Sequence, residues 1–337
     1  MPTPIQAWSA TTAGGRLSAF EYDPGPLQPE HVEIRVEHCG ICHSDLSMLD
    51  NEWKRTVYPF VPGHEVVGRV VARGEQVKGV NVGDRVGLGW FSASCMCCTQ
   101  CMSGDHHLCP NGEETIVGRH GGFADRVRCH WSWAVRLPEG LDHAAAGPLF
   151  CGGITVFSPI VECDVRPTDR VGVIGIGGLG HMAIQFLNKW GCEVTAFTSS
   201  EAKRAEAQAL GAHQVVTSTD RAALKPLAGR FDFILVTVNV KLDWAAYVAA
   251  LRPRGRLHFV GAVLDPIGVN GFHLIGGQKT ISGSPMGSPA TITRMLDFCA
   301  RHGIAPQVER FPMSRVNDAL EHLRAGKARY RVVLTAD

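Results

Sequence analysis

Five cysteines lie within sixteen positions of the stretch SCMCCTQCMSGDHHLC, residues 94 to 109. Four of them are separated by two, two and seven residues: Cys95, Cys98, Cys101 and Cys109. Four thiolates brought together by tight turns satisfy tetrahedral zinc and leave no position open for substrate. We therefore predict a closed, structural zinc site with Cys97 outside it. A chance cysteine-rich loop is the alternative.

Three other stretches hold isolated cysteine or histidine residues beside turn residues: CGICHSD, VPGHEVVG and PLFCGGIT. Cys42, His64 and Cys151 from these stretches would give zinc two sulfurs and one nitrogen. Such a set leaves the fourth position of the metal free for water or a substrate oxygen, as catalytic zinc requires. Distance along the chain does not show that the three meet, and each alone is as readily explained by packing or a surface hydrogen bond.

A glycine-rich stretch, VGVIGIGGLGHMAIQF, places Gly175, Gly177 and Gly180 in G-x-G-x-x-G order, with Gly178 and Leu179 inside the motif. The motif lies between an apolar strand and an apolar helix, the context that raises it above chance. Glycines there let the backbone approach a pyrophosphate, which the N-terminus of the helix stabilises. The stretch therefore predicts a dinucleotide-binding turn.

The residue that selects the cofactor is expected eighteen positions after the last glycine, at Thr198. An acidic residue there would hydrogen-bond the ribose of NAD and repel a 2′-phosphate. Thr198 has no charge, and Ser199, Ser200 and Lys203 follow as hydrogen-bond donors. We therefore predict NADP(H) as the cofactor, although Lys203 alone could be a solvated helix charge.

The elements that carry these motifs change character along the chain. Short alternating runs such as HVEIRVEHCG and EVVGRVVARG predict a mostly β first part. From about Pro167, apolar strands alternate with amphipathic helices, which predicts an α/β doubly wound parallel sheet. Near the C-terminus, PATITRMLDFCARHG predicts a helix, and a further helix and a closing strand follow. We expect one domain from residues 1–150 and 290–337 and another from 151–289.

Composition limits the partners and the compartment. Lys plus Arg number 33 and Asp plus Glu 32, which leaves no basic surface for nucleic acid or an anionic membrane. A zinc ribbon that binds nucleic acid is therefore a weak alternative for the cysteine cluster. No apolar run reaches the length of a membrane span, and no secretory signal is visible. We expect a cytoplasmic protein, in which clustered cysteines among the 12 present indicate metal rather than disulfides.

The stretch GHEVVGRVVARGEQV, Gly63 to Val77, has a glycine, a His-Glu pair and glycines at its sixth and twelfth positions. In this the sequence resembles the zinc-dependent medium-chain alcohol dehydrogenases. Within that family it looks like the cinnamyl alcohol dehydrogenase branch, particularly its bacterial broad-range, NADPH-linked aldehyde reductases. The resemblance covers essentially the whole chain and implies a mostly β, GroES-like catalytic domain and a Rossmann cofactor domain.

The resemblance also implies a catalytic zinc held by Cys42, His64 and Cys151, with Glu65 as a neighbouring or exchangeable ligand. Asp45 falls at the position of an acidic residue that orients the zinc-bound histidine.

Ser44 matches the hydroxyl that relays a proton to the substrate oxygen, although a helix N-cap or turn serine is as good an explanation. The family commonly ends this relay in a histidine where this chain has Ser47. His43 or water would have to replace it.

Further residues are assigned by the resemblance alone. Trp53 and Trp90 line the substrate channel, Arg331 reaches the cofactor pyrophosphate, and Val260 and Met286 border the nicotinamide. Core packing for the aromatic residues and a plain surface role for the arginine are the alternatives. Large aromatic walls favour aromatic or medium-chain aldehydes over hydrated polyols.

The predicted protein is an NADP-dependent alcohol dehydrogenase or aldehyde reductase with two zinc ions per subunit, one catalytic and one structural. The alternatives are an NAD-dependent polyol or secondary alcohol dehydrogenase and a catalytically silent cofactor-binding protein. Its substrate is a small alcohol or aldehyde. The expected assembly is a homodimer, with a homotetramer as the alternative, and neither nucleic acid nor membrane is an expected partner.

Overall fold

The computed structural model describes residues 3–217 and 221–337. The chain separates into two compact units, one formed by Met1–Ile154 with Gly287–Asp337 and the other by Thr155–Met286. The limits that we predicted at residues 150 and 290 differ from these by a few positions. The reason is that helix α4, Gly152–Glu162, begins in the first unit and ends in the second.

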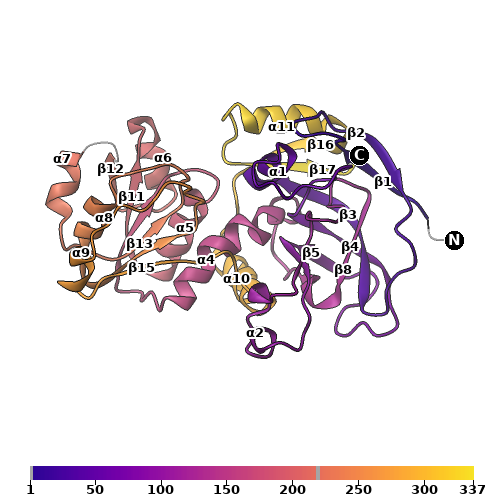
Figure 1. Cartoon of the computed structure of the whole chain (residues 1–337), viewed down its shortest axis with the longest axis horizontal. Coiled ribbons are helices and arrows are strands. Elements are labelled where there is room, and N and C mark those ends of the chain that lie inside the picture. The colour runs from indigo at the N-terminus through magenta and orange to yellow at the C-terminus, as the bar shows by residue number, and fades with distance from the viewer. Residues whose placement is uncertain (1–2, 218–220) are drawn as a thin grey trace. The chain divides into compact units, whose positions relative to one another are not determined.

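A seven-stranded sheet forms the framework of the first unit (Figure 1). Its strand order is β16-β17-β3-β4-β5-β9, and β8 also pairs with β3. All pairs are antiparallel except β16 with β17. The strands are β3 (His31–Ile41), β4 (Val66–Arg73), β5 (Arg85–Leu88), β8 (Arg126–His130), β9 (Val135–Arg136), β16 (Val308–Pro312) and β17 (Arg331–Thr335). The alternating runs near the N-terminus therefore form strands, as predicted.

Two small hairpins and short helices complete this unit. The hairpins are β1 (Ile5–Ser9) with β2 (Ser18–Tyr22), and β6 (Phe91–Ala93) with β7 (Glu113–Glu114). The α-helices are α1 (His43–Leu49), α2 (Thr99–Met102), α3 (His143–Ala146), α10 (Pro289–His302) and α11 (Val316–Arg324). The 3-10 helices are η1 (His106–Leu108), η2 (Trp131–Trp133), η3 (Gly147–Phe150) and η6 (Met313–Arg315). The two helices and the closing strand predicted near the C-terminus are α10, α11 and β17.

The second unit is built on a six-stranded sheet in which every pair is parallel (Figure 1). Its order is β12-β11-β10-β13-β14-β15, the arrangement of a doubly wound dinucleotide-binding sheet. The strands are β10 (Arg170–Ile174), β11 (Glu193–Thr198), β12 (Gln214–Thr217), β13 (Phe231–Val236), β14 (Leu251–Phe259) and β15 (Thr280–Gly283). The helices are α5 (Gly180–Trp190), η4 (Glu201–Lys203), α6 (Arg204–Ala209), α7 (Arg221–Leu224), η5 (Lys225–Leu227), α8 (Trp244–Ala250) and α9 (Phe272–Ile275). The predicted fold class is therefore confirmed.

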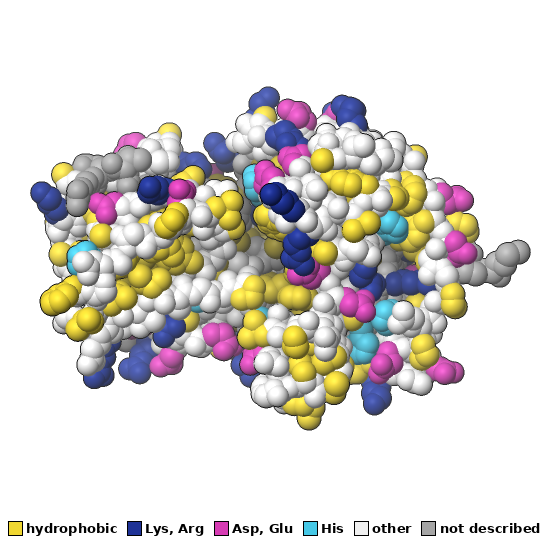
Figure 2. Space-filling view, viewed as in Figure 1, with side chains coloured by type: hydrophobic (Ala, Val, Ile, Leu, Met, Phe, Trp, Pro, Cys, Tyr) yellow, Lys and Arg dark blue, Asp and Glu magenta, His cyan; other side chains and the backbone are white. Residues whose placement is uncertain are grey.

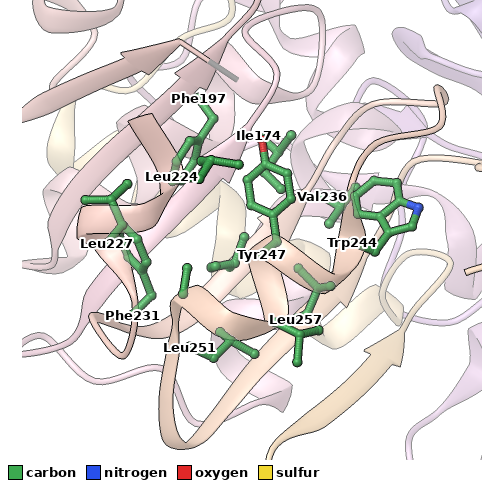
Figure 3. Close-up of a cluster of buried hydrophobic side chains, with 13 residues drawn as sticks. Ile174, Phe197, Leu224, Leu227, Phe231, Val236, Trp244, Tyr247, Leu251 and Leu257 are labelled. Carbon is green, nitrogen blue, oxygen red and sulfur yellow. The ribbon is translucent and has the colours of Figure 1, made fainter. Parts of the chain in front are cut away.

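An apolar cluster packs α8 against the parallel sheet (Figure 3). Tyr247 lies in its middle, with its ring centroid 5.3 Å from that of Phe197 and 6.2 Å from that of Trp244. Tyr247 is fully buried, and its hydroxyl has no hydrogen-bond partner among the described residues. A buried polar group without a partner destabilises the folded state, because the hydrogen bonds that it made to water are lost and not replaced.

Replacing Tyr247 by phenylalanine should therefore stabilise the second unit. We expect the free energy of unfolding to rise by about 1 kcal/mol, because the ring packing is kept and the unpaired hydroxyl is removed. Urea denaturation followed by fluorescence measures the change. Tyr22, a half-buried tyrosine of the first unit whose ring centroid lies 4.5 Å from that of His120, provides the control substitution. A lower stability of the Tyr247 variant would mean that its hydroxyl is hydrogen-bonded.

No single helix within residues 3–217 and 221–337 has both the length and the apolar character needed to cross a membrane. Within the same described residues, one bent pair of helices, 143–150 with 152–162, is long and apolar enough when the two are taken together, by length and composition only.

Candidate functional site

Pairing of β3 with β4 brings Cys42 and His64 together. Cys42 directly follows β3, and His64 lies two residues before β4. The antiparallel register places Cys39 opposite Val66, so the two strand ends lie side by side. The sequence stretches CGICHSD and VPGHEVVG thus meet at one end of the sheet.

The third residue, Cys151, is brought to the same place by η3. The ring of Phe150 lies against β5 at Gly87, where an added Cβ would come within 2.0 Å of that ring. This close approach fixes the segment that ends at Cys151. Its Sγ lies 3.8 Å from the Sγ of Cys42 and 3.3 Å from the Nε2 of His64.

These distances match a tetrahedral zinc site. With zinc–sulfur bonds of about 2.3 Å and zinc–nitrogen bonds of about 2.0 Å, two sulfurs lie about 3.8 Å apart and a sulfur and a nitrogen about 3.5 Å. The ligand atoms of Cys42, His64, Glu65 and Cys151 all lie within 4.8 Å of one another. Among the described residues, Oε2 of Glu65 is buried without a hydrogen-bond partner. The donor set therefore fits zinc.

Asp45 holds this arrangement in place from a fully buried position. Its Oδ1 accepts hydrogen bonds from Nδ1 of His64 at 3.0 Å and from the amide of Gly63 at 2.9 Å, and its Oδ2 accepts from the amide of Cys42 at 2.9 Å. Burial alone lowers the pKa of His64, but Asp45 and Cys42 more than offset this and raise it. With its Nδ1 proton on Asp45, His64 directs Nε2 toward the cysteine sulfurs.

The protonation states of the Cys42 and Cys151 thiols depend on each other. A hydrogen bond from the Cys151 thiol lowers the pKa of Cys42, and the same bond raises that of Cys151. A second thiolate at this distance needs a cation beside it. The donor set is thus suited to a divalent metal.

Glu65 is paired with Arg331, an interaction that the sequence did not indicate. Arg331 lies in β17 beside β3, where Val332 pairs with Ile41, and its guanidinium donates to the Glu65 carboxylate. Burial raises the pKa of Glu65 to about 7, with Arg331 acting in the opposite direction. Arg331, expected at the cofactor pyrophosphate, therefore lies in the first unit with a buried carboxylate as its partner.

Ser44 lies next to the candidate metal ligands. Its Oγ is 3.7 Å from the sulfur of Cys42. Ser47 is on the same helix α1 but is buried, with 4% of its surface exposed, whereas His43 is exposed. Ser47 therefore offers no direct route for a proton to solvent.

The two tryptophans expected in the substrate channel lie together beside the ligands. The ring of Trp90 packs edge-on against His64, with centroids 5.0 Å apart. The ring of Trp53 packs against Trp90 at 5.9 Å. They form an aromatic wall next to the metal ligands, and we use this name for the pair below.

The cysteine cluster is compact in the structure. Its sulfurs lie within 4.8 Å of one another: Cys95, Cys98, Cys101 and Cys109. The Cys95–Cys109 sulfur distance is 3.5 Å and the Cys98–Cys109 distance 3.9 Å, near the value expected for tetrahedral zinc. Cys97 is exposed and is not part of this group. The donor set suits a closed zinc site.

The glycine turn joins β10 to α5. Gly175 has a φ of +95°, and a Cβ on Gly180 would lie 1.9 Å from the carbonyl oxygen of Gly175. Turn and helix can therefore pack this closely only with glycine at both positions. A Cβ at Gly177 would meet no atom within 4 Å. The space beside Gly177, at the N-terminus of α5, fits the approach of a pyrophosphate.

The residues predicted to select the cofactor lie at and just after the end of the neighbouring strand. Thr198 ends β11, and its Oγ1 accepts a hydrogen bond from the amide of Ser200 at 3.1 Å. Lys203 donates from Nζ to the carbonyl of Ile176, in the glycine turn, at 2.8 Å. Ser199 is exposed beside them. The structure thus brings this group next to the glycine turn.

Two residues expected near the nicotinamide follow the last two strands of the same sheet. Val260 follows β14, and its amide donates to the carbonyl of Val236 at 3.0 Å. Met286 is buried at the end of the second unit.

Comparison with known families gives two matches. Residues 28–139 match the alcohol dehydrogenase GroES-like domain, and residues 178–301 match the zinc-binding dehydrogenase domain. Among curated proteins, the chain is 58% identical to the aldehyde reductase AdhA of Synechocystis sp., over 98% of each chain. It is 37% identical to cinnamyl alcohol dehydrogenase 7 of Arabidopsis thaliana, over 97% of this chain and 94% of that one.

Solved structures give the same picture. A cinnamyl alcohol dehydrogenase, SbCAD4 from Sorghum bicolor, superposes with a TM-score of 0.94 at 37% identity, covering 99% of this chain and 98% of that one. The CAD from Helicobacter pylori complexed with NADP(H) superposes with a TM-score of 0.91 at 28% identity, covering 99% of both chains.

Proposed function

Because the chain belongs to the zinc-dependent alcohol dehydrogenase family, an oxidoreductase family that interconverts alcohols and aldehydes, we propose that it reduces aromatic or medium-chain aldehydes with NADPH. The observation that carries this proposal is the donor set of Cys42, His64 and Cys151 beside the aromatic wall. Three protein ligands leave one position of a tetrahedral zinc for the substrate oxygen. The neighbouring rings favour a flat, apolar substrate body.

Three features support the choice of NADP(H). Thr198 places no carboxylate at the end of β11 to repel a 2′-phosphate. Lys203 and Ser200 next to it can donate hydrogen bonds to that phosphate. The similar Helicobacter pylori protein was solved with NADP(H).

In the proposed mechanism, Cys42, His64 and Cys151 would hold a zinc ion, which would supply Lewis-acid polarisation of the carbonyl, and bound NADPH would supply the hydride. Asp45 keeps the His64 ring oriented through the Nδ1 hydrogen bond. Glu65 stays beside the ligands, restrained by its ion pair with Arg331.

Ser44 has the proton-transfer role in this proposal. Its hydroxyl, next to Cys42, donates a proton to the oxygen of the new alcohol during reduction and recovers one from water. Because Ser47 is buried and Ser44 only half-buried, water that reaches Ser44 is the proposed source of that proton. Trp53 and Trp90 limit the access of other water to the carbonyl.

The test is the initial rate of cofactor oxidation with cinnamaldehyde, comparing NADPH with NADH at equal concentration. Fast turnover with a strong preference for NADPH would support reaction, cofactor and substrate class together. If the protein turned over only NADH, and only with carbonyl compounds derived from polyols, the result would contradict this proposal and favour a polyol dehydrogenase.

The cysteine cluster is proposed to bind a second, structural zinc. Replacing Cys101 by serine is expected to reduce the zinc content from two ions to one per chain and to lower the melting temperature, because the cluster ties its loop together through the metal. Metal analysis and a thermal melt measure both effects. Replacing the exposed Cys97 by serine is the control and should leave the zinc content unchanged. Equal zinc loss in both variants would contradict the assignment.

We also propose that the chain forms a homodimer through the second unit. Strand β15 is the last of its sheet in the described chain, and apolar side chains are exposed in nearby segments: Leu264, Ile267, Phe272 and Ile275. Figure 2 shows hydrophobic side chains gathered over the α9 end of the unit. Exposed apolar patches of this kind are typical of association surfaces.

Replacing Phe272, whose exposed fraction is 81%, by aspartate is expected to shift the protein toward monomer. The new charge would have to be desolvated in the interface. Sedimentation velocity measures the distribution. Val82→Asp adds the same charge at an exposed apolar residue of the first unit and should not change it. A wild-type monomer, or an unaffected variant, would reject this interface.

The near balance of 33 basic and 32 acidic residues supports a small-molecule substrate over nucleic acid as the partner of the protein.

A cytoplasmic location is also part of the proposal. Cell fractionation with an antibody against the protein would test the location.

A further inference from the structure

A cavity of about 710 Å³ lies in the first unit, and none of Cys42, His64, Glu65 and Cys151 lines it. Its walls come from the segment that ends the cysteine cluster, from the following segment up to Arg119, and from Arg55 and Phe91. Phe91, Leu108 and Pro110 give it an apolar lining. A cavity of this size accommodates a small organic molecule.

Two ion pairs line this cavity. Nη2 of Arg55 lies 2.5 Å from Oε2 of Glu114, and Arg119 pairs with Glu113. The Glu114 side chain is only 17% exposed, whereas that of Arg55 is 49% exposed. The cavity thus combines apolar walls with two ion pairs, each of which has no net charge.

The Arg55–Glu114 pair adjoins the aromatic wall on both sides. Arg55 follows Trp53 by two residues, and Glu114 lies opposite Phe91 in the hairpin of β6 and β7. Phe91 directly follows Trp90, whose ring contacts His64. The amide of the residue after Glu114 donates to the carbonyl of Trp90 at 2.7 Å. The backbone segments that carry Arg55, Phe91 and Glu114 in the cavity lining are therefore the same segments that carry the aromatic wall or pair with it.

We propose that this cavity is an outer substrate subsite in which the Arg55–Glu114 pair selects against aldehydes that carry a charge at their far end. The inference rests on the proposed function, since it assumes that the aldehyde group lies at the metal ligands. A neutral aryl body packs on Phe91, and its polar substituents meet a donor and an acceptor without net charge. A carboxylate entering the cavity meets the carboxylate of Glu114, whose positive partner is already engaged.

The experiment compares two substrates that differ only at the far end of the ring, benzaldehyde and 4-carboxybenzaldehyde. In E114Q the Arg55 cation loses its partner, so the ratio of kcat/KM for the carboxylate to that for benzaldehyde should rise about fivefold. In R55M the Glu114 carboxylate is unpaired, so the ratio should fall about fivefold. Both changes should appear mainly in KM.

E37Q is the matched control, because it makes the same chemical change in a first-unit glutamate that is paired with Arg85 and does not line the cavity. It should leave the ratio within twofold of wild type. Thermal melts verify that each variant is folded. The calorimetric dissociation constants of benzyl alcohol and 4-(hydroxymethyl)benzoate give the same ratio without turnover.

Opposite shifts in E114Q and R55M support the subsite. Unchanged ratios in both, or equal shifts in E37Q, overturn it. If the wild-type enzyme turns over no aldehyde, the proposed function fails, and the calorimetric ratios still decide whether the cavity selects by charge.

Discussion

Replacing Cys42 by alanine is expected to lower kcat/KM at least about a thousandfold and to remove one zinc ion per chain. The variant leaves one thiolate, Cys151, with His64 and the Glu65 carboxylate, which Arg331 restrains. A site that has lost one of its two thiolates holds zinc far more weakly. Loss of the metal removes several kcal/mol of transition-state stabilisation, and each 1.4 kcal/mol is a factor of ten in rate. Metal analysis and steady-state kinetics on the same preparation measure both effects.

Cys129→Ala is the matched control. Cys129 is a fully buried thiol in β8 of the same unit and belongs to neither group of candidate ligands. Its substitution should reduce stability slightly and leave zinc content and kcat/KM close to wild type. A Cys42 variant that keeps two zinc ions and full turnover would exclude the proposed site.

Features formed by neighbouring residues were accessible from the sequence. The cysteine cluster spans fifteen positions from Cys95 to Cys109, so spacing alone indicated that its sulfurs meet. The glycine turn is equally local, because Gly175 and Gly180 constrain each other across one turn. Alternation of strands and helices gave the parallel sheet, since each strand needs a helix to return the chain.

Contacts between distant segments were not accessible in this way. That Cys42, His64 and Cys151 converge depends on the β3–β4 register and on the packing of Phe150. The sequence left this convergence open, and it was implied only by resemblance.

Pairs of charged residues far apart in the chain were missed altogether. Glu65 and Arg331 are 266 residues apart and meet because β17 pairs with β3. Arg55 and Glu114 meet through a hairpin too short to be recognised from alternation, since β7 has two residues. An ion pair between distant residues has no periodic pattern in the sequence. The residue type alone does not distinguish a charged side chain in a cavity from one on an exposed loop.

Replacing Thr198 by aspartate is expected to lower the ratio of kcat/KM for NADPH to that for NADH at least about a hundredfold. The carboxylate would repel the 2′-phosphate and would hydrogen-bond the ribose hydroxyl of NADH. An aspartate Oδ can also accept the hydrogen bond that Oγ1 of Thr198 receives from the amide of Ser200, so the local turn should persist. Steady-state kinetics with both cofactors gives the ratio, and fluorescence titration gives the binding constants without turnover.

Thr217→Asp separates a local contact from a general change of field. Thr217 ends β12 and pairs in register with Thr198 of β11, so its substitution adds the same charge one strand farther from the glycine turn. Thr217 lies one strand spacing, about 4.8 Å, farther from the glycine turn, so its carboxylate would not hydrogen-bond the ribose and would repel the 2′-phosphate from a greater distance. This variant should therefore lower the ratio much less than Thr198→Asp, by under about tenfold. Equal effects of the two substitutions would mean that Thr198 does not contact the cofactor. An unchanged ratio in Thr198→Asp would place the cofactor-selecting contact elsewhere, most directly at Lys203, whose ammonium is already bound to the glycine turn.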